Sequence, residues 1–200
     1  MLGDKNLVSE KVWLEAQKWE RDWWNCRNTY GEETKQLHYA KRMGLELQED
    51  SQGPFINLEN KNVLDVGGGP VSLLLKCRNL GNGVVIDPCD YPAWVRERYR
   101  SANIVYWRMK AEDMPTDRIY DETWIYNVLQ HVENPELVVS NMRRTSKIIR
   151  VFDWLEISGI GHPQYLVEKE MSEWFGGYGR VEMGNGGLEY FGIFRGDHYE

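Results

Sequence analysis

The chain has 200 residues and a formal net charge of −7, which is enough length for one hydrophobic core and short for two. Apolar residues make up 42% of the chain and aromatic residues 12%, so the sequence predicts a folded protein. Proteins that grip nucleic acid usually present a basic face to the phosphates. The acidic balance therefore argues against a nucleic-acid partner.

The cysteines Cys26, Cys77 and Cys89 are odd in number and widely spaced. They form no Cys-x-x-Cys pair, which argues against a zinc site and a disulfide scaffold, and we expect no metal. No apolar run approaches the length that crosses a bilayer, and the first residues show no signal-like apolar segment. These observations predict a cytoplasmic protein with no membrane partner.

The first fifty residues have a helical pattern. Trp19, Trp23 and Cys26 recur at four- and three-residue spacing, which places an apolar stripe on a polar helix. Residues 28–31 interrupt this pattern, and a second helix is expected over 32–43, ended by Gly44. A loop is expected at the Ser-Gln-Gly-Pro that follows.

From residue 62 onward, short apolar runs alternate with helical segments. Strands are expected at residues 62–66, 83–87, 104–109, 122–126 and 147–152. Helices are expected at residues 71–80, 92–102 and 135–144. Alternation of this kind predicts a parallel sheet covered on both faces by right-handed crossovers.

The last forty residues depart from this alternation. A helix is expected over 163–175, followed by strands at 180–183 and 188–194. The connection between the two strands is Gly-Asn-Gly-Gly, which favours a hairpin. The otherwise parallel sheet is therefore expected to end in an antiparallel pair.

A glycine loop follows the first expected strand, at Gly67, Gly68 and Gly69. Glycine allows a sharp turn and leaves room for a ligand against the backbone, and a helix starting at Val71 would offer free N–H groups. Alone, this loop is also consistent with a tight turn that binds nothing.

Acidic residues follow the next two expected strands. Asp87 lies 20 residues after Gly67, a spacing that places a carboxylate beside the ribose of a bound nucleotide. Glu112 and Asp113 follow the third strand, where a carboxylate can accept from the exocyclic amine of adenine and Met114 can pack on the ring. Residues 126–132 then end the fourth strand, at the edge where open α/β sheets bind ligands.

In this order, four motifs resemble those of the class I S-adenosylmethionine (SAM)-dependent methyltransferases. They occupy residues 63–69, 87–88, 111–115 and 127–132. The resemblance implies an α/β fold that is Rossmann-like and doubly wound. The mostly parallel sheet would have seven strands, an antiparallel C-terminal hairpin and an added N-terminal helical segment. Residues 1–50 would form this helical cap or lid, and residues 51–200 the SAM-binding domain.

The resemblance also assigns cofactor contacts. Asp65 and the loop glycines would hold the methionine part of SAM, and Asp87 would bind the ribose. Glu112 or Asp113 would accept from the adenine amine, and Asn127 would contact the methionine end by its backbone. The complete expected set is Asp65, Gly67, Gly68, Gly69, Asp87, Pro88, Glu112, Asp113, Met114, Asn127 and Val128. Many family members have a further glycine where this chain has Val71, which should alter the start of the following helix.

Methyl transfer from a sulfonium is an in-line displacement that depends chiefly on alignment, and a base is needed only if the acceptor loses a proton. His131 is the first candidate base because an imidazole titrates near neutrality, although simple packing against the cofactor explains it equally well. His162 and Asp153 are further candidates after the fifth strand. The product derived from SAM would be S-adenosylhomocysteine (SAH).

The acceptor is expected to be a small molecule that is hydrophobic, aromatic or sugar-like. A lid over its pocket would be formed by Trp19, Trp23, Trp24 and Tyr30, although packing of a helix on the sheet is an equal explanation. Nothing in the sequence predicts the oligomeric state.

Two other classes of function remain open. An NAD-dependent oxidoreductase shares the strand–loop opening but requires glycine at position 72, where this chain has Ser72. The second is a protein that binds SAM without transferring its methyl group, although the intact cofactor motifs argue against such decay.

Overall fold

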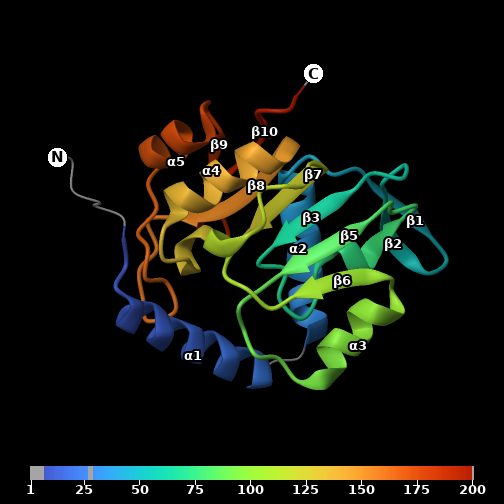
Figure 1. Cartoon of the computed structure of the whole chain (residues 1–200), viewed down its shortest axis with the longest axis horizontal. Helices are drawn as coiled ribbons and strands as arrows, with labels where there is room; N and C mark the ends of the chain where they lie inside the picture. Colours follow the sequence, from blue (N-terminus) through green and yellow to red (C-terminus); the bar gives the residue numbers. More distant parts are fainter. Residues whose placement is uncertain (1–6, 27–28, 200) are drawn as a thin grey trace.

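The centre of the molecule is a seven-stranded sheet in the order β6-β5-β3-β7-β8-β10-β9 (Figure 1). The structure is a computed structural model that describes residues 7–26 and 29–199, without the side chains of residues 25, 26, 29, 30 and 33. The strands are β3 (Val63–Val66), β5 (Gly83–Ile86), β6 (Ile104–Trp107), β7 (Tyr120–Tyr126), β8 (Ser146–Leu155), β9 (Arg180–Gly184) and β10 (Gly187–Arg195). The first five are parallel, whereas β10 is antiparallel to β8 and β9. The predicted sheet and its antiparallel hairpin are confirmed.

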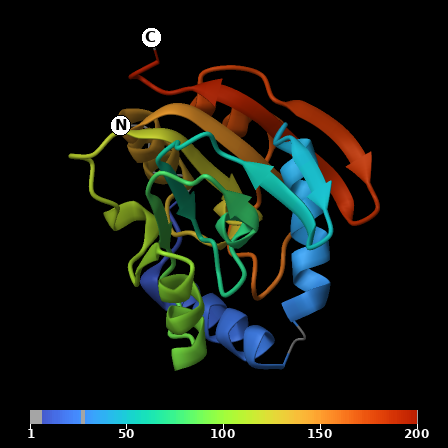
Figure 2. The ribbon, with the colours of Figure 1, turned by 90° about the vertical axis from the view of Figure 1, so that its right-hand side faces the viewer.

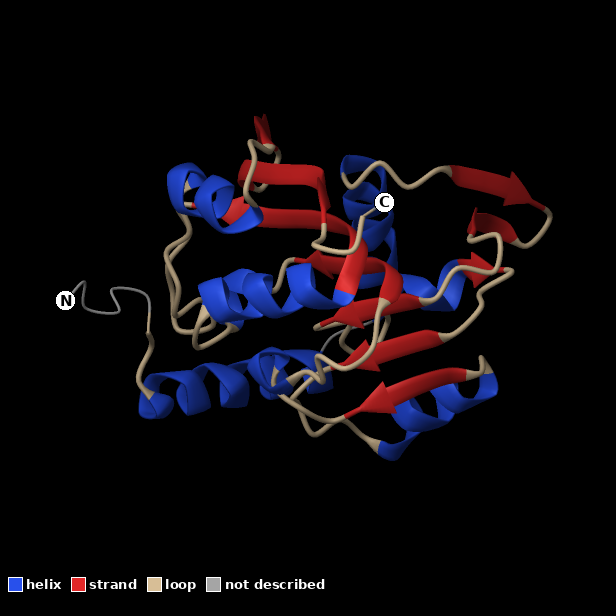
Figure 3. Ribbon diagram, turned by 45° about the horizontal axis from the view of Figure 1, so that its top comes forward, coloured by secondary structure: helices blue, strands red, loops and turns tan. Residues whose placement is uncertain are grey.

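Helices cover both faces of this sheet (Figure 3). They are α1 (Glu10–Cys26), α2 (Thr29–Arg42), α3 (Ala93–Ser101), α4 (Pro135–Thr145) and α5 (Glu168–Phe175). Side chains alternate along a strand, so Leu64 and Val66 pack in the core beneath α4 and α5, while Val63 packs beneath α2 and α3. The expected helix start at Asn134 is confirmed, because its side chain accepts from the backbone N–H of Leu137.

The helix expected over residues 71–80 is a wrong prediction. These residues form a short 3₁₀ turn, η1 (Leu73–Lys76), followed by the strand β4 (Cys77–Arg78). β4 joins β1 (Leu47–Asp50) and β2 (Gly53–Asn57) in a separate three-stranded sheet, so the expected loop at 51–54 is only the turn between β1 and β2.

Hydrogen bonds from distant residues explain why η1 replaces a helix. The hydroxyls of Tyr99 and Tyr126 accept from the backbone N–H groups of Ser72 and Leu73, and the Ser72 hydroxyl accepts from Leu74. Side chains from α3 and β7 therefore hold this turn in place, and the chain leaves it at Cys77 to pair with β2. Neither tyrosine is local to this turn, so the local pattern did not reveal it.

The helix expected over 163–175 is shorter than predicted, because α5 begins only at Glu168. The preceding chain is extended, and Gln164 ties it to the segment after β7. Its backbone N–H donates to the carbonyl of Gln130, and its side-chain amide donates to the carbonyls of Val132 and Glu133. These bonds leave no room for an additional helical turn.

The two N-terminal helices, α1 and α2, pack against different parts of the central sheet. In Figure 1, α1 passes beneath the ends of the central strands, and Figure 2 shows it at one end of the molecule while α2 rises beside the sheet. The domain boundary predicted at residue 50 falls at the β1–β2 turn and stays a prediction. None of the helices in the described residues has both the length and the hydrophobicity that crossing a membrane requires.

Candidate functional site

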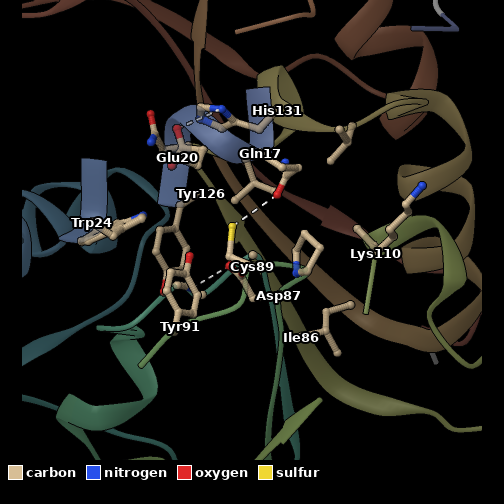
Figure 4. A pocket seen from close by; sticks show the side chains of 18 of the residues that line it. Gln17, Glu20, Trp24, Ile86, Asp87, Cys89, Tyr91, Lys110, Tyr126 and His131 are labelled. Atoms are coloured by element: carbon tan, nitrogen blue, oxygen red, sulfur yellow. Dashed lines mark hydrogen bonds and ion pairs between the residues drawn. The ribbon is translucent and has the colours of Figure 1, made fainter. Parts of the chain in front are cut away.

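A cavity lies where β3, β5 and β7 end, with α1 packed across its mouth (Figure 4). Its floor comes from the chain that follows these strands and β6: Gly67, Gly68, Gly69, Ile86, Asp87, Pro88, Cys89, Tyr91, Lys110, Ala111, Glu112, Tyr126, Asn127, Val128, His131 and Val132. Its roof and one side come from the N-terminal helices: Trp13, Gln17, Glu20, Trp24, Glu32, Lys35, Gln36 and Tyr39. The mixed lining of aromatic, aliphatic and a few charged side chains is typical of a small-molecule site.

The glycine loop needs its glycines for conformation and for space. Gly67 has φ +71° and Gly69 has φ +60°, in the left-handed region that side chains disfavour. A Cβ at Gly67 would lie 2.5 Å from a Val128 methyl carbon. At Gly69 the nearest atom would belong to the Trp24 ring, at 3.6 Å, so α1 approaches the loop here. The loop therefore offers its bare backbone to the cavity.

Asp87 ties the end of β5 to this loop. Its carboxylate accepts from the backbone N–H of Gly69 at 3.1 Å and of Cys89 at 2.9 Å. Burial raises the pKa of Asp87 to about 6, and these two backbone hydrogen bonds oppose the rise. The roof also meets this point, since the Cys89 thiol donates to the Gln17 side chain at 3.2 Å (Figure 4). Asp87 is thus a buried carboxylate at the cavity wall, where the predicted ribose would lie.

Of the two acidic residues after β6, Glu112 and Asp113, only Glu112 lines the cavity. Glu112 lines the cavity, and one of its oxygens accepts from the backbone N–H groups of Glu133 and Asn134 at 2.8 and 3.0 Å. Asp113 is exposed and Met114 is buried in the core, and neither is among the residues that line the cavity. Glu112 is therefore the better placed of the two predicted adenine contacts.

Asp65 lies behind the loop rather than in the cavity wall. It is fully buried, and one carboxylate oxygen accepts from the hydroxyls of Ser72 and Tyr126, each at 2.5 Å. Burial raises the pKa of Asp65 to about 7. A Cβ at Gly68 would come within 2.8 Å of this carboxylate. Asp65 is thus placed to hold the loop in position from beneath.

The turn after β7 is held in a similar way. Asn127 and Val128 both line the cavity, and Asn127 adopts a left-handed φ of 58°. Asp153, at the end of β8, accepts from the backbone N–H groups of Val128 and Leu129 at 3.2 and 2.8 Å. Asp153 is completely buried and is not among the lining residues, and burial raises its pKa to about 7. This position fits a support for the turn better than a base.

His131 lines the cavity, but both of its ring nitrogens have neighbours. Nδ1 lies 2.5 Å from the carbonyl oxygen of Gly161, so it carries the proton, and Nε2 lies 3.3 Å from the donating amide of Gln130. Burial lowers the pKa of His131 to about 4. His162 packs on it with ring centroids 4.9 Å apart, and burial lowers its pKa to about 4 as well. Both imidazoles are therefore neutral near pH 7.

The predicted lid residues do not all reach the cavity. Trp24 lines the cavity, whereas Trp19 and Trp23 stack on each other with centroids 5.2 Å apart and are not among the lining residues. The side chain of Tyr30 falls outside the described part of the structure. The sequence reading missed Gln17 and Glu20, which line the roof. The available signal was their helical spacing from Trp13, at which polar side chains join an otherwise apolar face.

Because the site and its supports contain buried carboxyls, we expect the ligand-free protein to unfold at a higher urea concentration at pH 6.5 than at pH 8. Burial raises the pKa of four of them, to about 6 for Asp87 and about 7 for Glu20, Asp65 and Asp153. A carboxyl with a raised folded-state pKa adds stability below its unfolded-state pKa, and that stability is lost as pH rises through the folded-state value. Urea unfolding followed by tryptophan fluorescence measures the change.

The two histidines act in the opposite sense, but in a different pH range. Because their folded-state pKa is lowered from 6.5 to about 4, they remove stability as pH falls through 6.5 toward 4. Between pH 8 and 6.5 only a small part of this loss occurs, so the two histidines offset the effect of the four carboxyls only in part. A midpoint that rises from pH 6.5 to pH 8 would contradict the assignment of buried, protonatable carboxyls to this site.

Comparison with known proteins gives one match to a protein-family model. Residues 64–148 match the family model described as "Methyltransferase domain". A search of curated protein sequences finds no match.

Solved structures share the fold at low sequence identity. A SAM-dependent methyltransferase of Thermotoga maritima has a TM-score of 0.57 and 12% identity, covering 92% of this chain and 99% of that one. Magnesium protoporphyrin IX methyltransferase of Synechocystis, solved with bound SAM, has a TM-score of 0.55 and 10% identity, covering 69% and 71%. A SAM-dependent methyltransferase of Aquifex aeolicus has a TM-score of 0.53 and 17% identity, covering 68% and 82%. The chain therefore shares its fold with solved SAM-dependent methyltransferases, and the part of it from residue 64 to residue 148 matches the methyltransferase domain model.

Proposed function

We propose that the chain transfers the methyl group of SAM to a small-molecule acceptor held in the same cavity. The observation that carries this proposal is that the glycine loop, Asp87 and Glu112 line one continuous cavity under α1. The residues fit the cofactor, since the loop leaves its backbone bare and Asp87 closes the wall beside it. SAM, when bound, supplies an electrophilic methyl group on a sulfonium.

Each part of the cavity has a task in this proposal. Asp87 accepts from the ribose hydroxyls, and Glu112 accepts from the adenine amine. The backbone of the glycine loop and of Asn127 and Val128 contacts the methionine end, while Asp65 holds the loop. The roof helix α1 excludes water, which favours alignment of the reacting atoms over hydrolysis.

The turn η1 favours this cofactor over a dinucleotide. A pyrophosphate is usually bound at a helix N-terminus by free backbone N–H groups. Here the N–H groups of Ser72, Leu73 and Leu74 are bonded to side chains, and Ser72 donates its own hydroxyl proton to Asp65. SAM carries no phosphate and does not require those groups, so this arrangement supports SAM over NAD.

The acceptor proposed is small and hydrophobic, aromatic or sugar-like. Support comes from the rings of Trp24, Tyr39 and Tyr126, which line the cavity. The charge of −7 supports a small molecule over nucleic acid. We place the reaction in the cytoplasm, as the sequence predicts.

Titration calorimetry with SAM, SAH and NAD tests the cofactor part of the proposal. We expect SAM and SAH to bind with dissociation constants of about 1–100 μM, and NAD to give no heat of binding. Absence of heat with both SAM and SAH would rule the proposal out. Release of SAH in a screen of small-molecule classes separates methyl transfer from binding alone, since a SAM-binding protein without activity releases none above background.

A further inference from the structure

One end of the cavity is not used by the cofactor contacts proposed above. We call it the α2 end, formed by Glu20 and Trp24 of α1 and by Glu32, Lys35 and Tyr39 of α2. Lys110 and Trp13 form the opposite end, where the Lys110 ammonium lies 4.0 Å from the centre of the Trp13 ring. Figure 4 shows Trp24 and Lys110 on opposite sides of the cavity. The adenine loop is beside Lys110, so the α2 end is the space left for an acceptor.

The α2 end holds more negative than positive charge. Lys35 is engaged by Glu32, with Nζ and Oε2 2.7 Å apart. Glu20 lies 3.4 Å from Nδ1 of His131, but that imidazole is neutral and donates to the carbonyl of Gly161. Only 16% of the Glu20 side chain is exposed, and burial raises its pKa to about 7 despite a hydrogen bond from Trp24. Lys35 lowers the pKa of Glu20 as well, so the two carboxylates Glu20 and Glu32 share one ammonium and one negative charge at this end is unmatched.

Aromatic side chains complete the same end. Tyr39 is 1% exposed, and its hydroxyl is paired with Trp154. The rings of Tyr39 and Trp24 at this end also favour a cation, because the face of an aromatic ring is negative. A ligand with positive charge suits both the Glu20 carboxylate and these rings.

We propose that the acceptor is a small aromatic or alkyl amine, which binds at the α2 end through Glu20 and is methylated on nitrogen. This inference rests on the proposed function. The Glu20 carboxylate takes one proton from the bound ammonium, which frees the nitrogen lone pair. The nitrogen then forms a bond to the methyl carbon as the carbon–sulfur bond breaks, and the electron pair of that bond stays on sulfur. The products are the methylated ammonium and SAH, and Glu20 returns its proton to solvent.

The variant Glu20→Gln, which keeps the side-chain shape and removes the charge, tests the binding part. The matched control is Glu15→Gln, because Glu15 is exposed on the same helix. We expect SAM and SAH to bind both variants and the wild type with dissociation constants equal within about twofold. A loss of SAM affinity without a loss of SAH affinity would overturn the inference, because it would show that Glu20 faces the sulfonium. A loss of both would overturn it by placing Glu20 in the cofactor site.

Acceptors of matched shape test the chemistry. The probes are 2-phenylethylamine, 2-phenylethanol and phenylacetate, together with the corresponding trios built on benzyl and on indolylethyl groups. With each wild-type or variant protein loaded with SAM, kcat/KM is measured from SAH release. We expect amines to exceed alcohols and acids about tenfold or more, and Glu20→Gln to lower the value for amines about tenfold or more while Glu15→Gln leaves it unchanged.

The outcomes distinguish this inference from the proposed function. Equal rates for amines and alcohols, or no turnover with any amine, would overturn the amine assignment, and so would full amine activity in Glu20→Gln. The binding of SAH to the wild type decides separately whether the cavity is a SAM site. Equal thermal unfolding of Glu20→Gln and wild type confirms that a lost activity reflects the charge and not the fold.

Discussion

Asp87→Ala is expected to weaken SAH binding about 100-fold or more, the largest loss for any single side chain of the cofactor site. A carboxylate that accepts from two ribose hydroxyls contributes about 1.5–3 kcal/mol for each charge-assisted hydrogen bond. The variant also removes the acceptor of the Gly69 and Cys89 backbone N–H groups, which frees the loop that the ligand contacts. Calorimetry at pH 7.5, above the pKa of about 6 for Asp87, gives the wild-type reference.

The control for this variant is Asp90→Ala. Asp90 lies close by in sequence but is exposed, and its carboxylate pairs with Arg108 at 3.0 Å. Exposed ion pairs of this kind contribute little, so we expect SAH affinity to stay within about twofold of wild type. Unchanged affinity in Asp87→Ala would show that the ribose position is assigned to the wrong residue.

Arg150→Met is expected to lower the free energy of unfolding by about 3–5 kcal/mol, because it leaves a buried carboxylate without its main partner. Glu122 on β7 is 1% exposed, and its Oε2 lies 2.6 Å from Nε of Arg150 on the neighbouring strand β8. Lys61 lies 2.9 Å from the other oxygen, and Trp124 donates to Oε2 at 2.9 Å. Arg150 also donates to the carbonyl of Met43, which ties the end of α2 to the sheet.

The sign of the pH dependence provides a second readout for this pair. Burial alone would raise the pKa of Glu122, but Arg150, Trp124 and Lys61 together outweigh burial and the pKa is lowered from 4.5. Its stabilisation is therefore present above pH 4.5 and is lost as pH falls through the lower folded-state value. Arg150→Met should remove this acid sensitivity.

Urea unfolding with Arg144→Met as control tests the prediction, since Arg144 is an exposed arginine on α4. We expect the control to stay within about 0.5 kcal/mol of wild type. The double variant Arg150→Met/Glu122→Gln should recover part of the loss, because the unpaired charge is gone. A loss below about 1 kcal/mol in Arg150→Met would contradict the role given to this ion pair.

The parts of the fold that could be predicted are those set by local pattern. Alternating apolar runs placed β3, β5 and β7 within a few residues, and Asn134 marked the start of α4 through its cap. The turn η1 could not be predicted, because the hydroxyls of Tyr99 and Tyr126 hold it from elsewhere in the chain. A leucine-rich run has the same appearance whether it forms a helix or a buried turn.

In the candidate site, too, the residues placed by local pattern could be predicted, and those placed by tertiary contacts could not. Asp87 and the glycine loop follow strands directly, so topology alone brings them to one edge of the sheet. Whether Asp65 faces the cavity or lies behind the loop depends on the hydroxyl of Ser72, which spacing does not reveal. Glu20 depends on how α1 crosses the strand ends, a tertiary relation between segments more than forty residues apart in sequence.

The position of α1 has a consequence for the rate at which the product is released. This helix meets cavity residues through Trp13 on Lys110, Gln17 on Cys89 and Glu20 on His131. In the proposed function, SAM would enter and SAH would leave between α1 and the strand ends, and either passage would disturb these three contacts. We therefore expect the helix to set how long the product stays, as lids do when their opening is slower than the bond-making step. The same polar and cationic contacts that complete the site would then also limit the rate of product release.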